Sequence, residues 1–194
     1  MIEAFDGTIG YESDEGGIYT GSSFSDFRIH DSVFMSSVFS GCSFSGASIR
    51  NTVFRNADLS GADFSSSRLE NVTFEGCRLT GAVFSSSRII ASAIRGSVCM
   101  YSSFMLASVS KSEIADSDLT GSCFDRVKCS QASLTMCNLT RSSFISTPLR
   151  DLALHESIID GIMLSENLPE LRGAQLDITQ AVSIARLLGA DVIG

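Results

Sequence analysis

The feature that most constrains this chain is a repeat of five residues. Every fifth residue from Phe24 to Leu164 is apolar, without a gap. The residue two positions earlier is usually small, most often Ala, Ser or Cys. A period of five fits neither an α-helix of 3.6 residues per turn nor a strand that alternates every two residues. It suits a chain that turns a corner every five residues and points two side chains inward between corners.

A second period, of twenty residues, is superimposed on the first. Twenty residues therefore make one coil with four sides, and coils stacked about 4.8 Å apart would bond each other's backbone groups. We expect an all-β fold, a right-handed quadrilateral parallel β-helix of about seven coils over residues 19–164. One column of the coil would form a core ladder of stacked rings. Its members are Phe24, Phe44, Phe64, Phe84, Phe104, Phe124 and Phe144.

Several five-residue units share a more specific pattern: a small residue, Asp or Asn, Leu or Phe, then two polar residues. Residues 57–61 read Ala-Asp-Leu-Ser-Gly, and residues 117–121 read Ser-Asp-Leu-Thr-Gly. On these units the chain resembles the pentapeptide repeat family, most closely the loop-free members that give quinolone resistance or immunity to topoisomerase poisons. The resemblance covers about residues 19–164 and implies the β-helix solenoid. Bulky residues replace the small one at Phe27, Leu152 and Ile162, which predicts irregular last coils.

Both ends of the chain depart from the repeat. Residues 1–18 lose the pattern at Asp14 and are rich in acids, so we expect an irregular acidic N-terminal cap. The C-terminal segment, residues 165–194, contains Asp177 followed three positions later by Gln180, which is the pattern of a helix capping box. A short helix is therefore predicted over residues 178–188.

The predicted helix is amphipathic and has two open interpretations. It could cover the last coil alone, or it could cover that coil and also join two chains. In pentapeptide repeat proteins that protect topoisomerases, a similar tail joins two rods end to end. The resemblance of residues 174–193 to that tail implies a homodimer. The expected dimer interface consists of Ile178, Val182, Ala185 and Leu188 on one face, with Ile184 and Leu187 beside it.

Charge and cysteine spacing argue against several classes of function. The formal net charge is −8, and the first twenty residues alone carry −5. Because an acidic end repels phosphates, we expect no direct binding of nucleic acid. With no apolar stretch long enough for a membrane and no secretory signal, a soluble cytoplasmic protein is predicted. The six cysteines follow no CxxC spacing, which predicts no metal and no other cofactor.

The same sequence predicts no enzyme. Its two histidines are His30 and His155, and the rod would hold them roughly 30 Å apart, too far to share a metal ion or a catalytic triad. Glycines that recur every twenty residues, such as Gly61 and Gly81, are expected at corners and not in a phosphate loop. Among the cysteines, Cys123 alone is expected to face outward.

Two departures from a polar exterior are candidates for contact with a partner. The first is a side rich in bases, with Arg28, Arg50, Arg68, Arg88, Lys111, Lys128 and Arg150 against Asp31, Glu70 and Asp151. The favoured interpretation of this side is an ordinary solvated face. The second is a group of apolar residues at positions that should be exposed within about one coil, predicted as a partner surface. These residues are Ile90, Val98, Met100, Tyr101, Met105 and Leu106.

Two functions from different classes remain open. The family resemblance implies a non-enzymatic binding protein that protects DNA gyrase or a related type II topoisomerase from a quinolone or a peptide poison. Such family members are considered mimics of duplex DNA through their rod shape and acidity. Here residues 21–164 carry thirteen acids and twelve bases, so only partial mimicry is expected. The alternative is a structural or scaffolding module with an unrelated protein partner.

Overall fold

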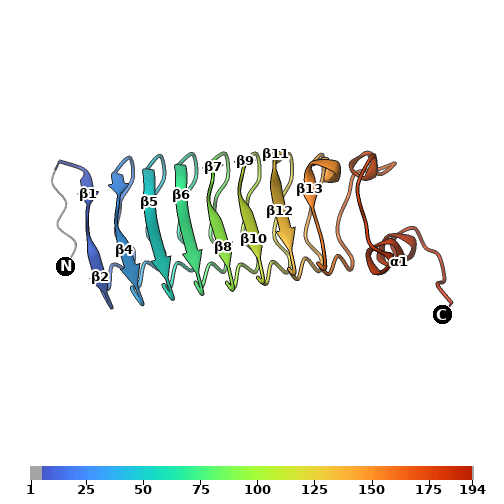
Figure 1. The fold of residues 1–194 in the computed structure, drawn as a ribbon, viewed down its shortest axis with the longest axis horizontal. Coiled ribbons are helices and arrows are strands. Elements are labelled where there is room, and N and C mark those ends of the chain that lie inside the picture. The colour runs from blue at the N-terminus through green and yellow to red at the C-terminus, as the bar shows by residue number, and fades with distance from the viewer. Residues whose placement is uncertain (1–5, 194) are drawn as a thin grey trace.

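The protein forms a straight rod of stacked coils with a helix at its C-terminal end (Figure 1). The computed structural model describes residues 6–193, and the strands of this range form one thirteen-stranded parallel sheet. The strands are β1 (Thr8–Gly10), β2 (Ser13–Glu15), β3 (Arg28–His30), β4 (Val33–Met35), β5 (Ser48–Arg55), β6 (Arg68–Glu75), β7 (Arg88–Ile90), β8 (Ala93–Arg95), β9 (Ser108–Ser110), β10 (Glu113–Ala115), β11 (Lys128–Ser130), β12 (Ala132–Thr135) and β13 (Leu152–Ala153). Two 3-10 turns, η1 (Leu149–Asp151) and η2 (Pro169–Leu171), precede the helix α1 (Ile178–Leu187).

Each strand pairs in parallel with a strand twenty residues away. Ile29 lies beside Ile49, and Ile49 lies beside Leu69. Where no strand is present, single bridges keep the same offset, as between Val38 and Asp58. The expected parallel β-helix with twenty residues per coil is therefore confirmed.

We name the four sides of the coil by the central inward residue of one coil. The Phe24 side comprises residues 22–26 and their equivalents at intervals of twenty. The Ile29 side (27–31), the Phe34 side (32–36) and the Phe39 side (37–41) follow in this order. The strands lie on the Ile29 and Phe34 sides, and single bridges link the coils on the other two. The Ile29 side is thus opposite the Phe39 side.

Columns of large apolar side chains fill the core. The seven phenylalanines of the Phe24 column form one continuous stack, with neighbouring ring centroids 4.8–5.1 Å apart. A second stack of Phe34, Phe54 and Phe74 has a spacing of 5.1 Å. The two stacks meet edge to face, with the planes of Phe64 and Phe74 at 80°. Stacking thus adds to the burial of each ring.

The small inward positions hold many serines, whose hydroxyl groups bond the backbone of the preceding coil. Ser157 Oγ donates a 2.8 Å hydrogen bond to the carbonyl oxygen of Leu134. Cys137 makes the equivalent contact with the carbonyl oxygen of Ile114. Within residues 6–193, no buried side-chain nitrogen or oxygen lacks a partner. A small polar residue therefore costs little at these inward positions.

The structure corrects the predicted N-terminal boundary. Strands β1 and β2 pair with β3 and β4, so residues 8–15 already belong to a coil and are not an irregular cap. Asp14 occupies an inward position there and accepts a 2.8 Å hydrogen bond from Ser37 Oγ. A carboxylate is tolerated at this position because the hydroxyl group replaces part of the hydration that burial removes.

The last coils are irregular. The 3-10 turn η1 takes the place of a strand on the Ile29 side, and the bulky Leu152 and Ile162 are buried in the core.

Within the described range, no helix is long and apolar enough to cross a membrane.

Candidate functional site

Five of the six residues predicted as a partner surface lie on two adjacent sides of the rod. Val98, Met100 and Tyr101 belong to the Phe39 side, whereas Met105 and Leu106 belong to the neighbouring Phe24 side. Tyr101 is 65% exposed, and Leu106 is 48% exposed. We call these five residues the Tyr101 surface.

Ile90 does not belong to this surface. It lies in β7 between Glu70 and Ser110, on the Ile29 side, across the rod from Val98. Ile90 and Val98 are only eight positions apart in the sequence. Even so, the coil turns a corner every five residues, so nearness in sequence does not place two residues on one side.

Further exposed apolar residues, which were not predicted from the sequence, lie on the same two sides. Ile145 and Met163 lie on the Phe24 side, and Ile158 lies on the Phe39 side. Met163 is 51% exposed and Ile158 is 52% exposed. Reading each outward column in steps of twenty residues would have found them, because Ile145 is two coils beyond Met105.

Tyr101 occupies a corner position where the coils on both sides have glycine, Gly81 and Gly121. Its φ angle is 57°, in the left-handed region that costs a non-glycine residue roughly 1–2 kcal/mol. The ring lies over Gly121, where a Cβ atom would be 2.8 Å from the ring carbons. Because the ring is mostly exposed, its burial within the chain does not offset this cost.

The six residues of the expected dimer interface are divided between two faces of α1. Ile184 is buried against the last coil together with Gln180 and Ser183. Ile178 and Leu188 lie on the opposite face, which points away from that coil, whereas Val182 and Ala185 are half-buried. Ile178 is 86% exposed and Leu188 is 66% exposed, and Leu187 at the helix end is also exposed.

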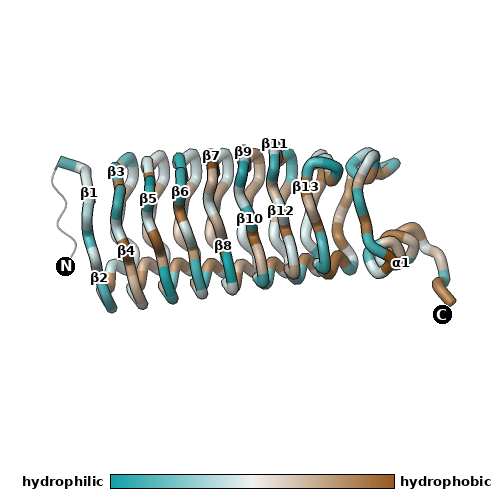
Figure 2. Tube along the Cα trace, in the orientation of Figure 1, coloured by the Kyte–Doolittle hydropathy of each residue, from teal (hydrophilic) through white to brown (hydrophobic). Residues whose placement is uncertain are grey.

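The apolar face of α1 therefore does not serve as the lid on the core. Polar Gln180 occupies the inner face because the last coil presents backbone carbonyl groups there, as described below. The chain beyond the helix is also hydrophobic and exposed, as Figure 2 shows at the C-terminal tip, where Ile193 is 94% exposed.

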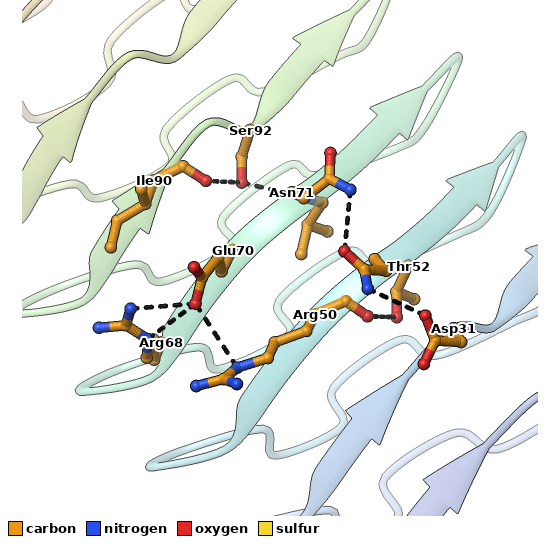
Figure 3. Close-up of polar contacts among 10 residues, drawn as sticks. Asp31, Arg50, Thr52, Arg68, Glu70, Asn71, Ile90 and Ser92 are labelled. Atoms are coloured by element: carbon orange, nitrogen blue, oxygen red, sulfur yellow. Dashed lines mark hydrogen bonds and ion pairs between the residues drawn. The ribbon is translucent and has the colours of Figure 1, made fainter.

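The Ile29 side carries a polar network across neighbouring coils (Figure 3). Glu70 pairs with Arg68 at 3.0 Å and with Arg50 at 3.5 Å. Beside them, Asn71 Nδ2 donates to Asn51 Oδ1, and Asn51 Nδ2 donates to Asp31 Oδ1, each at 2.9 Å. Hydrogen bonds from Asn51 and His30 hold the pKa of the Asp31 carboxyl below its usual value.

Charge is segregated by side along the rod. Over residues 7–164, the Ile29 side holds seven bases and three acids, a net charge of +4. The Phe34 side holds two bases and seven acids, a net of −5. The Phe24 and Phe39 sides have nets of −2 and −1. Over these residues a net charge of −4 is therefore divided unevenly, with a basic side next to an acidic one.

The histidines lie on different sides of the rod, and the cysteine thiols are buried or half-buried. Burial raises the pKa of Cys77 to about 11 and that of Cys129 to about 12, so both thiols stay protonated near neutral pH. Cys129, like Cys123, is partly exposed. His30 contacts Asp31 at 2.9 Å on the Ile29 side, whereas His155 is exposed on the Phe34 side. Among residues 6–193 there is no group of three or more His, Cys, Asp or Glu side chains placed to hold a metal ion.

The repeat geometry agrees with matches to known protein families. A model described as a pentapeptide repeat region matches residues 18–84, and a model of pentapeptide repeats in eight copies matches residues 122–161. The chain is a pentapeptide repeat protein. No curated protein sequence matches it.

Solved structures with the same fold include QnrB1, described as a plasmid-mediated fluoroquinolone resistance protein. A trypsin-treated variant of QnrB1 is 22% identical, with a TM-score of 0.54, 94% of this chain covered and 100% of that chain covered. For full-length QnrB1 the identity is 20%, the TM-score is 0.53, and 92% of this chain and 100% of that chain are covered. At this identity the likeness shows a shared fold, and this pentapeptide repeat protein needs its own functional test.

Proposed function

We propose that this pentapeptide repeat protein protects DNA gyrase, or a related type II topoisomerase, from an inhibitor in the cytoplasm without catalysing a reaction. The observation that most supports this is the acidic Phe34 side of an uninterrupted rod. A topoisomerase binds DNA through a basic surface, because that surface must hold phosphates. One acidic side can approach such a surface even though the whole body is nearly neutral. The fold shared with QnrB1, a fluoroquinolone resistance protein, is consistent with the proposal.

The acids of the Phe34 side differ in whether a nearby base neutralises them. Glu75 pairs with Arg55 at 2.8 Å, and Glu113 pairs with Arg95, so these two acids are partly neutralised. Asp116 and Glu156 are exposed, and neither forms an ion pair within residues 6–193. These two acids, with Glu12 and Glu15 of the first coil, would supply the partial DNA mimicry. The basic Ile29 side adjoins the Phe34 side and would lie beside this contact.

A homodimer through the C-terminal tail is part of the proposal. The exposed apolar face of α1 lies at the end of the rod, where a second copy can meet it around a two-fold axis. Two such rods, each with about seven coils at about 4.8 Å per coil, would span about 70 Å. A two-fold dimer of this kind matches the two-fold symmetry of a type II topoisomerase.

The proposal is tested by a gyrase supercoiling assay with and without a quinolone, across a titration of the protein. We expect rescue of supercoiling at intermediate protein concentration and inhibition at high concentration, because the rod would compete with DNA. The double variant Asp116→Asn with Glu156→Gln should lose most of the rescue. The control Glu166→Gln with Asp191→Asn removes the same charge from exposed positions outside the Phe34 side and should retain it.

The alternative function is that of a scaffolding module whose partner binds the Tyr101 surface. The exposed apolar residues at this corner favour it. The supercoiling assay separates the two functions. If tens of micromolar protein neither rescues nor inhibits gyrase with two unrelated poisons, the scaffolding function is favoured and topoisomerase protection is rejected.

A further inference from the structure

We propose that the middle of the Ile29 side binds a single phosphate monoester, carried as a phosphoserine or phosphothreonine by a partner protein. The site would use Arg88, Lys111 and Lys128, which lie on three successive coils around Ser108. It is distinct from the Tyr101 surface and uses none of the acids of the Phe34 side. Three features support it: cations without acidic partners, hydroxyl groups without hydrogen-bond partners, and acids that limit its length.

The cations of this site are not neutralised by the protein. Arg88 and Lys128 occupy one outward column, on either side of Ser108. Lys111 follows Ser110, the last residue of β9, at the corner with the Phe34 side. All three basic side chains are exposed, and none of them forms an ion pair within residues 6–193. Three uncompensated positive charges therefore lie on three neighbouring coils.

The spacing of these cations allows them to act on one bound group. Two strand spacings separate the α-carbons of Arg88 and Lys128, about 10 Å. Lys111 lies three residues along the chain from Ser108, which is again roughly 10 Å. Arginine and lysine carry their charges on long flexible stems. Their charged ends can therefore converge above Ser108 from three directions.

Two hydroxyl groups form the floor between the cations. Ser108 and Ser110 are the outward residues of β9, and both are half-buried. Within the described range, neither hydroxyl group has a hydrogen-bond partner, whereas the inward Ser112 donates to the carbonyl oxygen of Ser110 at 2.8 Å. Both outward hydroxyl groups can thus donate to an oxygen of a bound group.

Acids of the same side limit the site at both ends. In the preceding coil, Glu70 is held by Arg68 and Arg50 (Figure 3). In the following coil, Asp151 pairs with Arg150 at 3.6 Å. The three coils between them carry no acid on the Ile29 side. The basic segment is therefore only about 10 Å long, which suits one phosphoryl group and not a row of them.

The acidic Phe34 side adjoins the site but does not neutralise it. Its acid nearest in sequence to Lys111 is Glu113, which accepts a 2.6 Å hydrogen bond from Nε of Arg95. Asp116 lies five positions beyond Lys111, at the far corner of that side. Lys111 therefore remains available to a ligand on the Ile29 side.

A phosphate monoester suits this arrangement better than a carboxylate does. It carries a charge of about −1.5 to −2 near neutral pH and has three strong acceptor oxygens. Three cations and two hydroxyl groups can supply a donor to each of these oxygens, whereas a carboxylate has one charge and two oxygens. Hydrogen bonds between charged groups are also stronger than those between neutral groups. The site should therefore prefer phosphoserine to glutamate.

The surroundings of the site favour a protein as the carrier. Because the three cations are exposed, a small metabolite bound there would remain mostly in water. Ser130 and Gln131, which follow Lys128 closely, are exposed and can hydrogen-bond the backbone of a peptide. A nucleic acid would place further phosphates beyond the three coils, against Glu70 or Asp151, which repel them.

The test is an NMR titration of the nitrogen-15-labelled full-length protein with a nine-residue alanine–glycine peptide that carries one central phosphoserine. We expect saturable shifts of the amides of β7, β9 and β11, and at least tenfold weaker binding when glutamate replaces the phosphoserine. The double variant Arg88→Gln with Lys128→Gln should weaken binding at least tenfold. The control Arg28→Gln with Arg141→Gln removes two exposed cations outside the site and should change the affinity less than twofold.

A second pair of variants tests the floor of the site. Ser108→Ala should weaken binding of the phosphopeptide about threefold, whereas Ser48→Ala, in the same column three coils away, should leave it unchanged. Equal weakening by the two cation variants, or equal affinity for the phosphoserine and glutamate peptides, would overturn the phosphate site. Equal or tighter binding of glycerol phosphate, or of a DNA duplex, would overturn the assignment to a partner protein. Failure here leaves the gyrase proposal standing, because the supercoiling assay tests acids of the Phe34 side.

Discussion

The side-chain amide of Gln180 donates a 2.6 Å hydrogen bond to the backbone carbonyl oxygen of Leu154. In the two preceding coils, the equivalent carbonyl oxygens of Ile114 and Leu134 accept from an inward Cys or Ser of the next coil. Leu154 belongs to the last coil, which has no successor. Gln180 also donates to the carbonyl oxygen of Ser157 at 2.9 Å. One side chain from α1 thus replaces two donors of the missing coil.

The first prediction concerns this cap. Gln180→Leu keeps a side chain of similar size but leaves the two carbonyl groups buried without their amide donor. Each unsatisfied group costs about 1–3 kcal/mol, so we expect a lower free energy of unfolding and early loss of α1. Thermal unfolding and hydrogen exchange of the helix amides measure these effects. Gln175→Leu, at an exposed position, is the control, and equal destabilisation by both variants would contradict the role of Gln180.

The second prediction is a pH dependence of the same end of the rod. Burial opposes ionisation of Glu170, but hydrogen bonds from the Ser165 side chain and from the backbone of Ser146 and Ser165 outweigh it and lower its pKa. The stabilisation is therefore present above the ordinary pKa of about 4.3 and is lost as the pH falls through the lower folded value. We expect the stability difference between the native protein and Glu170→Gln to shrink as the pH falls below about 4.3. Denaturant unfolding at several pH values measures it, and a difference independent of pH would refute the prediction.

The third prediction concerns the phenylalanine stack. Phe84 is fully buried, with Phe64 and Phe104 each 4.9 Å away between ring centroids. Phe84→Ala should cost about 3–5 kcal/mol because it leaves a cavity inside a continuous stack. Ser85→Ala changes the adjacent, partly exposed outward residue and should cost less than about 1 kcal/mol. Chemical denaturation of both variants checks the difference.

The fourth prediction concerns the proposed dimer. Ile178→Asp with Leu188→Asp places charges on the outward face of α1 and should convert a dimer into a folded monomer, because burying unpaired carboxylates is costly. Thr179→Asp, also exposed, is the control and should remain dimeric. Deletion of residues 174–194 should also abolish the dimer, but it exposes the last coil and promotes aggregation. Sedimentation at micromolar concentration decides the matter, and a monomeric native protein would reject the proposed dimer.

The fifth prediction concerns the Tyr101 surface. Tyr101→Ala with Met105→Ser should leave the melting temperature nearly unchanged, since both side chains are exposed. If a partner uses this corner, its binding should weaken by about 2 kcal/mol, as expected for an anchor residue. Calorimetry with gyrase subunits, or with a partner recovered from a lysate, measures the effect. Unchanged affinity would exclude the Tyr101 surface from that contact.

Most of the fold could be predicted because its signal is local. Inward positions repeat every five residues, so the apolar column from Phe24 to Leu164 specifies the coil, and the twenty-residue recurrence of phenylalanine specifies four sides. The N-terminal boundary was wrong because Asp14 breaks the apolar pattern, while a distant hydroxyl group, that of Ser37, allows an acid at that inward position.

The sequence by itself determined the repeat, the parallel stacking, the inward side chains and the capping box that starts α1. Only the tertiary structure decided which outward side chains stay exposed and how the rod ends. It placed Ile90 across the rod from Val98 and turned the face of α1 that carries Ile178 and Leu188 away from the last coil. The physical reason is that inward positions are set by neighbours along the chain, whereas surfaces are set by neighbours one coil away. The structure at the end of the rod depends on replacing the hydrogen-bond donors that a further coil would have supplied.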